Sequence, residues 1–167
     1  MIADLAKSQE ETDKQMKETD KKISALGSTV GNLIETLVGG SNIVKKFREL
    51  NYVITKYSQN IYFGAGEEND GEIDIFLENG DIAILVEVKT TLRTQDIRDH
   101  IERLEKYRRY TDNHGGDKRR YIGAVAGANV HEKTVEYALN RGLYVIVQTG
   151  DAFKIVQTPE GFAAKEW

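Results

Sequence analysis

The chain has 167 residues, 40% of them hydrophobic and 30% charged, which suits one compact domain with an appendage. The absence of cysteine excludes disulfides, thiol catalysis and cysteine-ligated zinc, and it fits a protein of the reducing cytoplasm. No apolar run is long enough to span a membrane, and the net charge of −4 argues against a general nucleic-acid coat protein while leaving a local basic groove open.

Residues 1–38 are expected to form one helix with a coiled-coil seam. The seam positions alternate spacings of four and three residues: Leu5, Gln9, Thr12, Met16, Thr19, Ile23, Leu26, Val30, Leu33 and Leu37. A solvated helix with frayed ends is one interpretation, because the early seam positions are polar. A parallel oligomerising stalk is the other, and we favour it because a lone polar helix offers Leu26, Val30 and Leu33 no other partner. We therefore expect a homo-oligomer, a dimer in the simplest case.

After a break at Gly39-Gly40, a second helix is expected over 41–50, with Ser41 as its N-cap. The β-branched and aromatic run 52–57 predicts a strand, which 59–63 extends after a kink. A polar, glycine-rich loop over 64–71 then leads into the central feature of the chain.

That feature is a pair of strands over 71–89, joined at Asn79-Gly80, a pair typical of a type I′ hairpin turn. With this turn, Asp74 is expected to face Leu85 and to lie diagonally from Glu87. Alternation of side chains gives one face with Glu72, Asp74, Leu85, Glu87 and Lys89. The other face carries Ile73, Ile75, Ile82, Ile84, Val86 and Val88. The hairpin is thus a core element with an acidic cluster on one side.

The remaining elements alternate helices and strands. Helices are expected from Thr94 to about Tyr110 and from an Asn129 cap to Asn140. Strands are expected over 119–126, 143–148 and 152–157, before a tail of undetermined structure. The first three strands of the chain form a meander, and the later strand–helix–strand crossovers require parallel neighbours. We therefore predict an α/β sandwich with a mixed sheet.

The acidic cluster predicts a site for a hard divalent cation. Carboxylates this close repel each other unless a cation or a proton intervenes. Asp74 and Glu87 match the one or two carboxylates with which Mg²⁺ or Mn²⁺ is usually held, and the backbone carbonyl of Val88 offers a further oxygen. The ammonium of Lys89, on the same face, is suited to orienting a water molecule or stabilising a pentavalent phosphate. The chemistry indicated is metal-dependent hydrolysis of a phosphodiester.

The pattern Asp74 … Glu87-Val88-Lys89 on a hairpin, with a helix and a strand on either side, resembles the PD-(D/E)XK nuclease superfamily. The usual proline before the aspartate is replaced by Ile73. Within the superfamily the chain resembles uncharacterised proteins of the DUF3782 type, which carry an N-terminal coiled coil. The closer similarity lies in residues 31–35, 47–52 and 142–146. The resemblance implies a restriction-endonuclease-like mixed β-sheet sandwiched by helices, preceded by the coiled-coil helix.

The resemblance also implies roles and boundaries. Residues 1–38 would be the oligomerisation helix and residues 39–167 the nuclease-like domain, acting on DNA. Asp74 and Glu87 would bind Mg²⁺ or Mn²⁺, and Lys89 would be the catalytic lysine. Glu35, at the junction of the two units, matches an extra acidic residue of resolvase-like members and would complete the metal shell directly or through water.

Alternative interpretations stay open. A degraded nuclease fold would serve as an oligomeric binding or adaptor module without catalysis, and a solvated acidic face would carry no chemistry at all. His100 is expected either near the site or on the surface. Basic residues gather in three groups that would either line a nucleic-acid groove or cover solvated helix faces. These groups are Lys45, Lys46 and Arg48; Arg103, Lys106, Arg108 and Arg109; and Lys118, Arg119 and Arg120.

Overall fold

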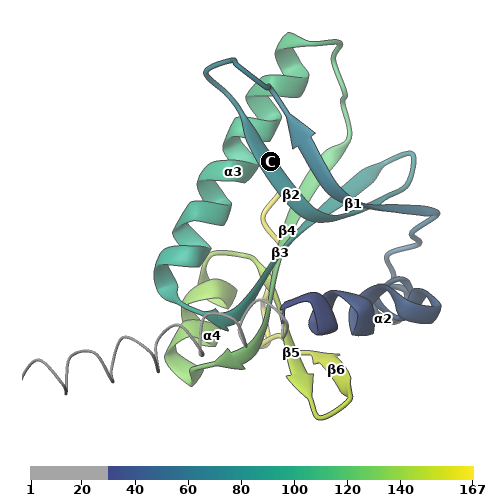
Figure 1. The fold of residues 1–167 in the computed structure, drawn as a ribbon, viewed down its shortest axis with the longest axis vertical. Coiled ribbons are helices and arrows are strands. Elements are labelled where there is room, and N and C mark those ends of the chain that lie inside the picture. The colour runs from purple at the N-terminus through teal and green to yellow at the C-terminus, as the bar shows by residue number, and fades with distance from the viewer. Residues whose placement is uncertain (1–29) are drawn as a thin grey trace, which may run out of the picture.

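One six-stranded sheet organises the structure, a computed structural model that describes residues 30–167 (Figure 1). Its strands are β1 (Lys56–Phe63), β2 (Gly71–Glu78), β3 (Ile82–Leu92), β4 (Arg120–Val130), β5 (Tyr144–Thr149) and β6 (Ala152–Ile155). The helical elements after residue 38 are η1 (Gly39–Ser41), α2 (Asn42–Glu49), α3 (Thr94–Asn113) and α4 (Glu132–Asn140). Within the described residues no helix is long and apolar enough to cross a bilayer.

The strands lie in the sheet in the order in which they occur along the chain. The meander β1–β2–β3 is antiparallel, β3, β4 and β5 are parallel, and β6 returns antiparallel to β5. Helices α3 and α4 make the two crossovers that the parallel pairs require. The predicted α/β architecture with a mixed sheet is confirmed.

Helices cover both faces of the sheet. Side chains of β3 alternate between two apolar clusters, so that Ile84 and Val86 belong to one and Leu85 to the other. The first cluster packs under α2, and the second packs under α3 and α4, which lie together on one side in Figure 1. Because both faces are covered, the central strands read as nearly continuous apolar runs.

The helix over residues 30–38 belongs to the globular part of the chain. Leu33 and Leu37 are completely buried in the same cluster as Phe47 of α2. The last seam positions therefore pack on the sheet, and a boundary at residue 38 cuts through one core. The reason is that a spacing of four and three residues serves a coiled-coil seam and a helix on a sheet equally well. The earlier part of the predicted stalk, residues 1–29, lies outside the described residues.

The turn between β2 and β3 is wider than the predicted type I′ turn. The ladder pairs Glu78 with Ala83 instead of Asp81, which shifts the register by two residues. The side-chain Oδ1 of Asn79 accepts a hydrogen bond from the backbone N–H of Asp81 at 2.7 Å. This local turn needs no positive φ at Asn79 or Gly80, and neither residue has one. Because the shift is by an even number of residues, the alternation of faces along β3 is unchanged.

The first strand pair bends at the level of Asp74. The strand β1 begins at Lys56, later than predicted, and its kink falls at Asn60, which has a φ of 52°. The register of β1 with β2 places Asn60 across from Asp74. Ile73, predicted to share a face with Ile75, packs instead in the cluster under α3. The strand pair β1–β2 therefore changes direction at Asp74.

Helix starts fall next to the predicted caps. The residue before α3 is Arg93 rather than Thr94, and its backbone N–H donates to the carboxylate of Asp96 at 2.8 Å. The residue before α4 is His131 rather than Asn129. The strand β4 runs to Val130, further than its apolar pattern indicates, and this moves the start of α4 two residues along the chain, whereas α3 starts one residue earlier than predicted.

The C-terminal residues, left undetermined by the sequence, extend the sheet at the amino end of β4. The backbone of Trp167 exchanges two hydrogen bonds with Tyr121, at 2.9 and 3.1 Å. The N–H of Lys165 donates to the carbonyl of Gly142 at 3.0 Å, where Gly142 has a φ of 79°. The tail therefore fills the place beside β4 that β5 leaves free.

Candidate functional site

Asp74 and Glu87 come together at the end of the β2–β3 ladder. The ladder ends at the pair Ile75 and Val86, and its register, if continued by one residue, would place Asp74 opposite Glu87. This would be closer than the diagonal arrangement expected from the sequence, because of the shifted turn. Oδ2 of Asp74 accepts a hydrogen bond of 2.8 Å from the backbone N–H of Val88. The side chain of Asp74 therefore links β2 to β3 beyond the last backbone pair of their ladder.

Glu87 is a buried carboxylate held by two cations. It is 6% exposed and lies between the buried residues Val86 and Val88 of β3. Its Oε2 accepts a hydrogen bond of 2.6 Å from Nη1 of Arg103 on α3. Its Oε1 lies 3.6 Å from Nζ of Lys89, whose side chain is 46% exposed. The lysine thus reaches from the buried acid toward solvent.

The electrostatics of this pair disfavour two negative charges. Burial, reinforced by the charge of Asp74, raises the pKa of Glu87 to about 7, although Arg103 and Lys89 oppose the shift. Burial also raises the pKa of Asp74, and the charge of Glu72 adds to that effect against the hydrogen bond from Val88. A cation bound between the two carboxylates would relieve the repulsion and the cost of burial together.

The structure brings together four of the five predicted site residues. Asp74, Glu87, Val88 and Lys89 share one end of the hairpin, with the amide of Val88 bound to Asp74. Glu35 is exposed on the helix whose leucines pack in the cluster on the opposite face of the sheet. Within residues 30–167 no group of three or more acidic, histidine or cysteine side chains is arranged to hold a metal ion. The role of Glu35 as a third acidic ligand stays a prediction.

Arg103 contacts the acidic site, a role that was not predicted from the sequence. The sequence placed it among basic residues for nucleic-acid contact. Its position follows from the inner face of α3, where Ile97, His100, Leu104 and Tyr107 are buried. A residue three after His100 and four before Tyr107 lies on that face and must find a partner on the sheet. The helical spacing could have predicted that Arg103 faces the sheet. Its partner, however, depended on which strand α3 covers.

His100 is neither at the surface nor in the cluster. It is completely buried, and its Nε2 contacts the carbonyl of Leu85 at 2.9 Å. Its Nδ1 is buried and has no hydrogen-bond partner within the part of the chain that the structure describes. Burial lowers the pKa of His100 to about 4, and the nearby charge of Arg103 acts in the same direction. The imidazole is therefore neutral at physiological pH and ties α3 to β3.

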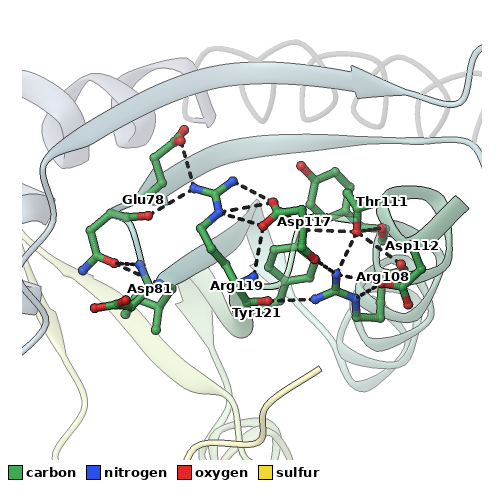
Figure 2. A network of polar contacts seen from close by, with 11 residues as sticks. Glu78, Asp81, Arg108, Thr111, Asp112, Asp117, Arg119 and Tyr121 are labelled. Atoms are coloured by element: carbon green, nitrogen blue, oxygen red, sulfur yellow. Dashed lines mark hydrogen bonds and ion pairs between the residues drawn. The ribbon is translucent and has the colours of Figure 1, made fainter. Parts of the chain in front are cut away.

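Two of the arginines predicted for a nucleic-acid groove are used inside the fold. Figure 2 shows Arg119 between Glu78 and Asp117, with Nη1 3.0 Å from Glu78 and Nη2 2.8 Å from Asp117. Arg108 binds the backbone carbonyls of Asp117 and Arg119 and the carboxylate of Asp112. The hydrogen bonds from Arg119 hold the pKa of Asp117 well below its usual range. This network fastens the segment between α3 and β4 and leaves these guanidinium groups little freedom for another ligand.

Comparison with known proteins assigns no activity to this arrangement. No protein-family profile matches the chain, and no curated protein matches it. Among solved structures, the chain is similar to AF1548, described as a protein of unknown function, at 14% identity and a TM-score of 0.43. The alignment covers 72% of this chain and 58% of that one, so the chain spans less than two thirds of AF1548.

Proposed function

We propose that the protein is a metal-dependent phosphodiester hydrolase that acts on DNA, a nuclease of the PD-(D/E)XK type. The observation that supports this most directly is the interacting carboxylates of Asp74 and Glu87, with Lys89 extending from the buried acid toward solvent. A buried acidic pair whose charges repel, next to a lysine, is costly for stability alone. Such arrangements are found where a cation and a reaction use them.

The donor set fits Mg²⁺ or Mn²⁺. Two carboxylates with water and substrate phosphate are the usual ligands of Mg²⁺. Val88 donates to Oδ2 of Asp74, which orients the carboxylate and leaves Oδ1 for a cation. Arg103 occupies Oε2 of Glu87, and Oε1, which lies 3.6 Å from Nζ of Lys89, is the oxygen that would bind the ion. Asp74 and Glu87 would hold the ion, with the carbonyl of Val88 as a further ligand, and Glu35 takes no part in this proposal.

A bound Mg²⁺ supplies a Lewis acid and a water molecule of lowered pKa at neutral pH. In the hydrolysis, the oxygen of water forms a bond to phosphorus, the bond from phosphorus to the leaving sugar oxygen breaks, and that oxygen takes up a proton. The ammonium of Lys89 holds the attacking water or the charged phosphoryl oxygens at the solvent-exposed side. Arg103 favours the ionised form of Glu87 and fixes the orientation of its carboxylate.

The decisive experiment is cleavage of plasmid and branched DNA with Mg²⁺ or Mn²⁺. Lys89→Ala is expected to lower cleavage by about a hundredfold, because it removes a charge that contacts the transition state rather than the fold. Lys154→Ala, a change of an exposed lysine on β6, is the matched control and should cleave like the wild type. Equal activity of the wild type and Lys89→Ala would contradict the proposal.

A catalytically inactive oligomeric binding module is the second candidate, and one observation favours it. Arg103 at 2.6 Å supplies Glu87 with an internal counter-charge, so the buried acid is stable without a metal. Calorimetric titration separates the two functions. Heat of Mn²⁺ binding that disappears in Asp74→Asn supports the nuclease. No binding at millimolar Mn²⁺ by either protein supports the binding module.

Oligomerisation is proposed to depend on the N-terminal heptads. Because Leu33 and Leu37 are core residues, the place to cut is before Val30 rather than after residue 38. We expect removal of residues 1–29 to convert an oligomer into a monomer that keeps its fold. Light scattering measures the mass, and circular dichroism controls for folding. A truncated, folded protein of unchanged subunit number would refute the stalk.

A further inference from the structure

A polar cleft lies beyond the carboxylate pair, at the carboxyl ends of β3 and β4. It is an open cleft of about 710 Å³ between the first turns of α3 and α4. The polar residues that line it are Thr91, Arg93, Thr94, Asn129, His131 and Thr134. In open α/β sheets this edge, outside the carboxyl ends of parallel strands, is where ligands bind.

The cleft is lined by groups that donate hydrogen bonds. None of the residues that line it, all between Thr91 and Thr134, carries a carboxylate. The guanidinium of Arg93 adds a positive charge, and the amino ends of α3 and α4 add a positive potential. The nearest acid of α3 is Asp96, whose carboxylate is already bound to the backbone N–H of Arg93 at 2.8 Å. Glu132 at the start of α4 is exposed and does not line the cleft.

The surroundings of Thr134 indicate a ligand in this cleft. It is 7% exposed and lines the cleft, yet its hydroxyl has no hydrogen-bond partner among residues 30–167. Thr111, which is equally buried, bonds its hydroxyl to the carbonyls of Tyr107 and Arg108. The hydroxyl oxygen of Thr134 is not one of the fully enclosed polar atoms that lack a partner in residues 30–167, so water reaches it through the cleft, and an acceptor of a ligand can replace that water.

The imidazole of His131 adds another donor. Its Nδ1 accepts a hydrogen bond of 3.1 Å from the backbone N–H of Lys133. In the neutral ring the proton is then on Nε2, which is the donor. Together with the hydroxyl of Thr134 and the guanidinium of Arg93, the cleft offers donors from both helix starts and from the strand end.

We propose that this cleft binds a phosphate group. A tetrahedral oxyanion presents several acceptor oxygens and no obligatory donor, which matches a lining of hydroxyl, amide and guanidinium groups without carboxylates. The arginine fork suits two phosphate oxygens at once. The volume exceeds that of a free phosphate and the cleft is open, so the group can be attached to a larger molecule.

The position of the cleft indicates where that phosphate belongs. Thr91 follows Lys89 by two residues on β3, a rise of about 7 Å. This is comparable to the separation of neighbouring phosphates along a nucleic-acid strand. A strand with one phosphate at Lys89 therefore reaches the cleft with the next. This assignment to nucleic acid rests on the proposed function, whereas the anion chemistry of the cleft does not.

The test uses the full chain in EDTA, so that no cleavage takes place. Inorganic phosphate and a short single-stranded oligonucleotide are titrated separately and followed by NMR through the amide signals of Thr91, Asn129 and Thr134. Thr134→Val, which removes the hydroxyl at nearly constant volume, and Arg93→Gln are each expected to weaken binding about tenfold. Arg120→Gln, at the opposite end of β4, is the matched control and should bind like the wild type.

Shifts of these amides with both probes, lost in the two variants, support a phosphate site that takes the nucleic-acid backbone. Shifts with inorganic phosphate alone support the site with a free or terminal phosphate as its ligand. The proposal is overturned if neither probe shifts these signals, or if Thr134→Val and Arg93→Gln both bind like the wild type. Absence of DNA cleavage by the wild type would count against the nuclease only, because the titrations need no activity.

Discussion

Replacing Glu87 by glutamine is expected to lower DNA cleavage about a thousandfold while raising the stability of the metal-free protein by about 1–2 kcal/mol. Both effects arise from one buried carboxylate. The pKa of Glu87 is raised from 4.5 to about 7, so stability falls as pH rises through that window and the full cost of the charge is present at pH 8. The amide removes this cost, and the loss of a charged partner for Arg103 offsets part of the gain.

Urea denaturation in EDTA at pH 8 measures the stability, and DNA cleavage with Mg²⁺ measures the activity. Glu78→Gln is the matched control, because Glu78 on β2 also pairs with an arginine, Arg119 at 3.0 Å. That carboxylate stands outside the proposed centre and is expected to leave cleavage unchanged while lowering stability. A Glu87→Gln protein that is less stable than the wild type and cleaves normally would show that the acid serves the fold.

His100 is expected to make the protein sensitive to acid. Burial lowers its pKa from 6.5 to about 4, so the unfolded chain binds a proton at a higher pH than the folded one. The stability that the neutral ring contributes is complete above pH 6.5 and is lost as pH falls toward 4, by about 3 kcal/mol in total. The carboxylates Asp74 and Glu87 have raised pKa values and act in the opposite direction, so the wild-type profile alone does not isolate His100.

The variant His100→Gln isolates it. The glutamine amide donates to the carbonyl of Leu85 in place of Nε2 and does not titrate, while the carboxylates are the same in both proteins. The stability of the wild type relative to His100→Gln is expected to drop by about 3 kcal/mol between pH 7 and pH 4, measured by urea denaturation at each pH. A difference that stays constant with pH would mean that His100 has the same pKa in the folded and unfolded states.

Much of the site could be predicted because it lies within one hairpin. The alternation of side chains placed Glu87 and Lys89 on one face without knowledge of the register, and the turn region brought Asp74 to them. The register itself was wrong by two residues, because the side chain of Asn79 competes with the backbone turn that Asn-Gly usually makes. A local hydrogen bond of 2.7 Å decided what a two-residue motif left undetermined.

Contacts between elements far apart in the chain could not be predicted from the sequence. Arg103 and Arg119 both looked like candidates for nucleic acid, and only their distance from Glu87, Glu78 and Asp117 assigns them to ion pairs of the fold. Glu35 shows the opposite case, an acid expected at the centre that the helix packing leaves exposed.

The sequence by itself determined the order of elements, the mixed sheet and the hairpin with its acids and lysine, because apolar periodicity and strand–helix alternation are local signals. Only the tertiary structure decided which face each helix covers. It thereby decided that Leu33 and Leu37 are core residues, that Arg103 holds Glu87, and that Thr134 lines a polar cleft. These outcomes depend on packing between segments far apart in the chain, and that packing minimises the free energy of the whole fold rather than of any one element.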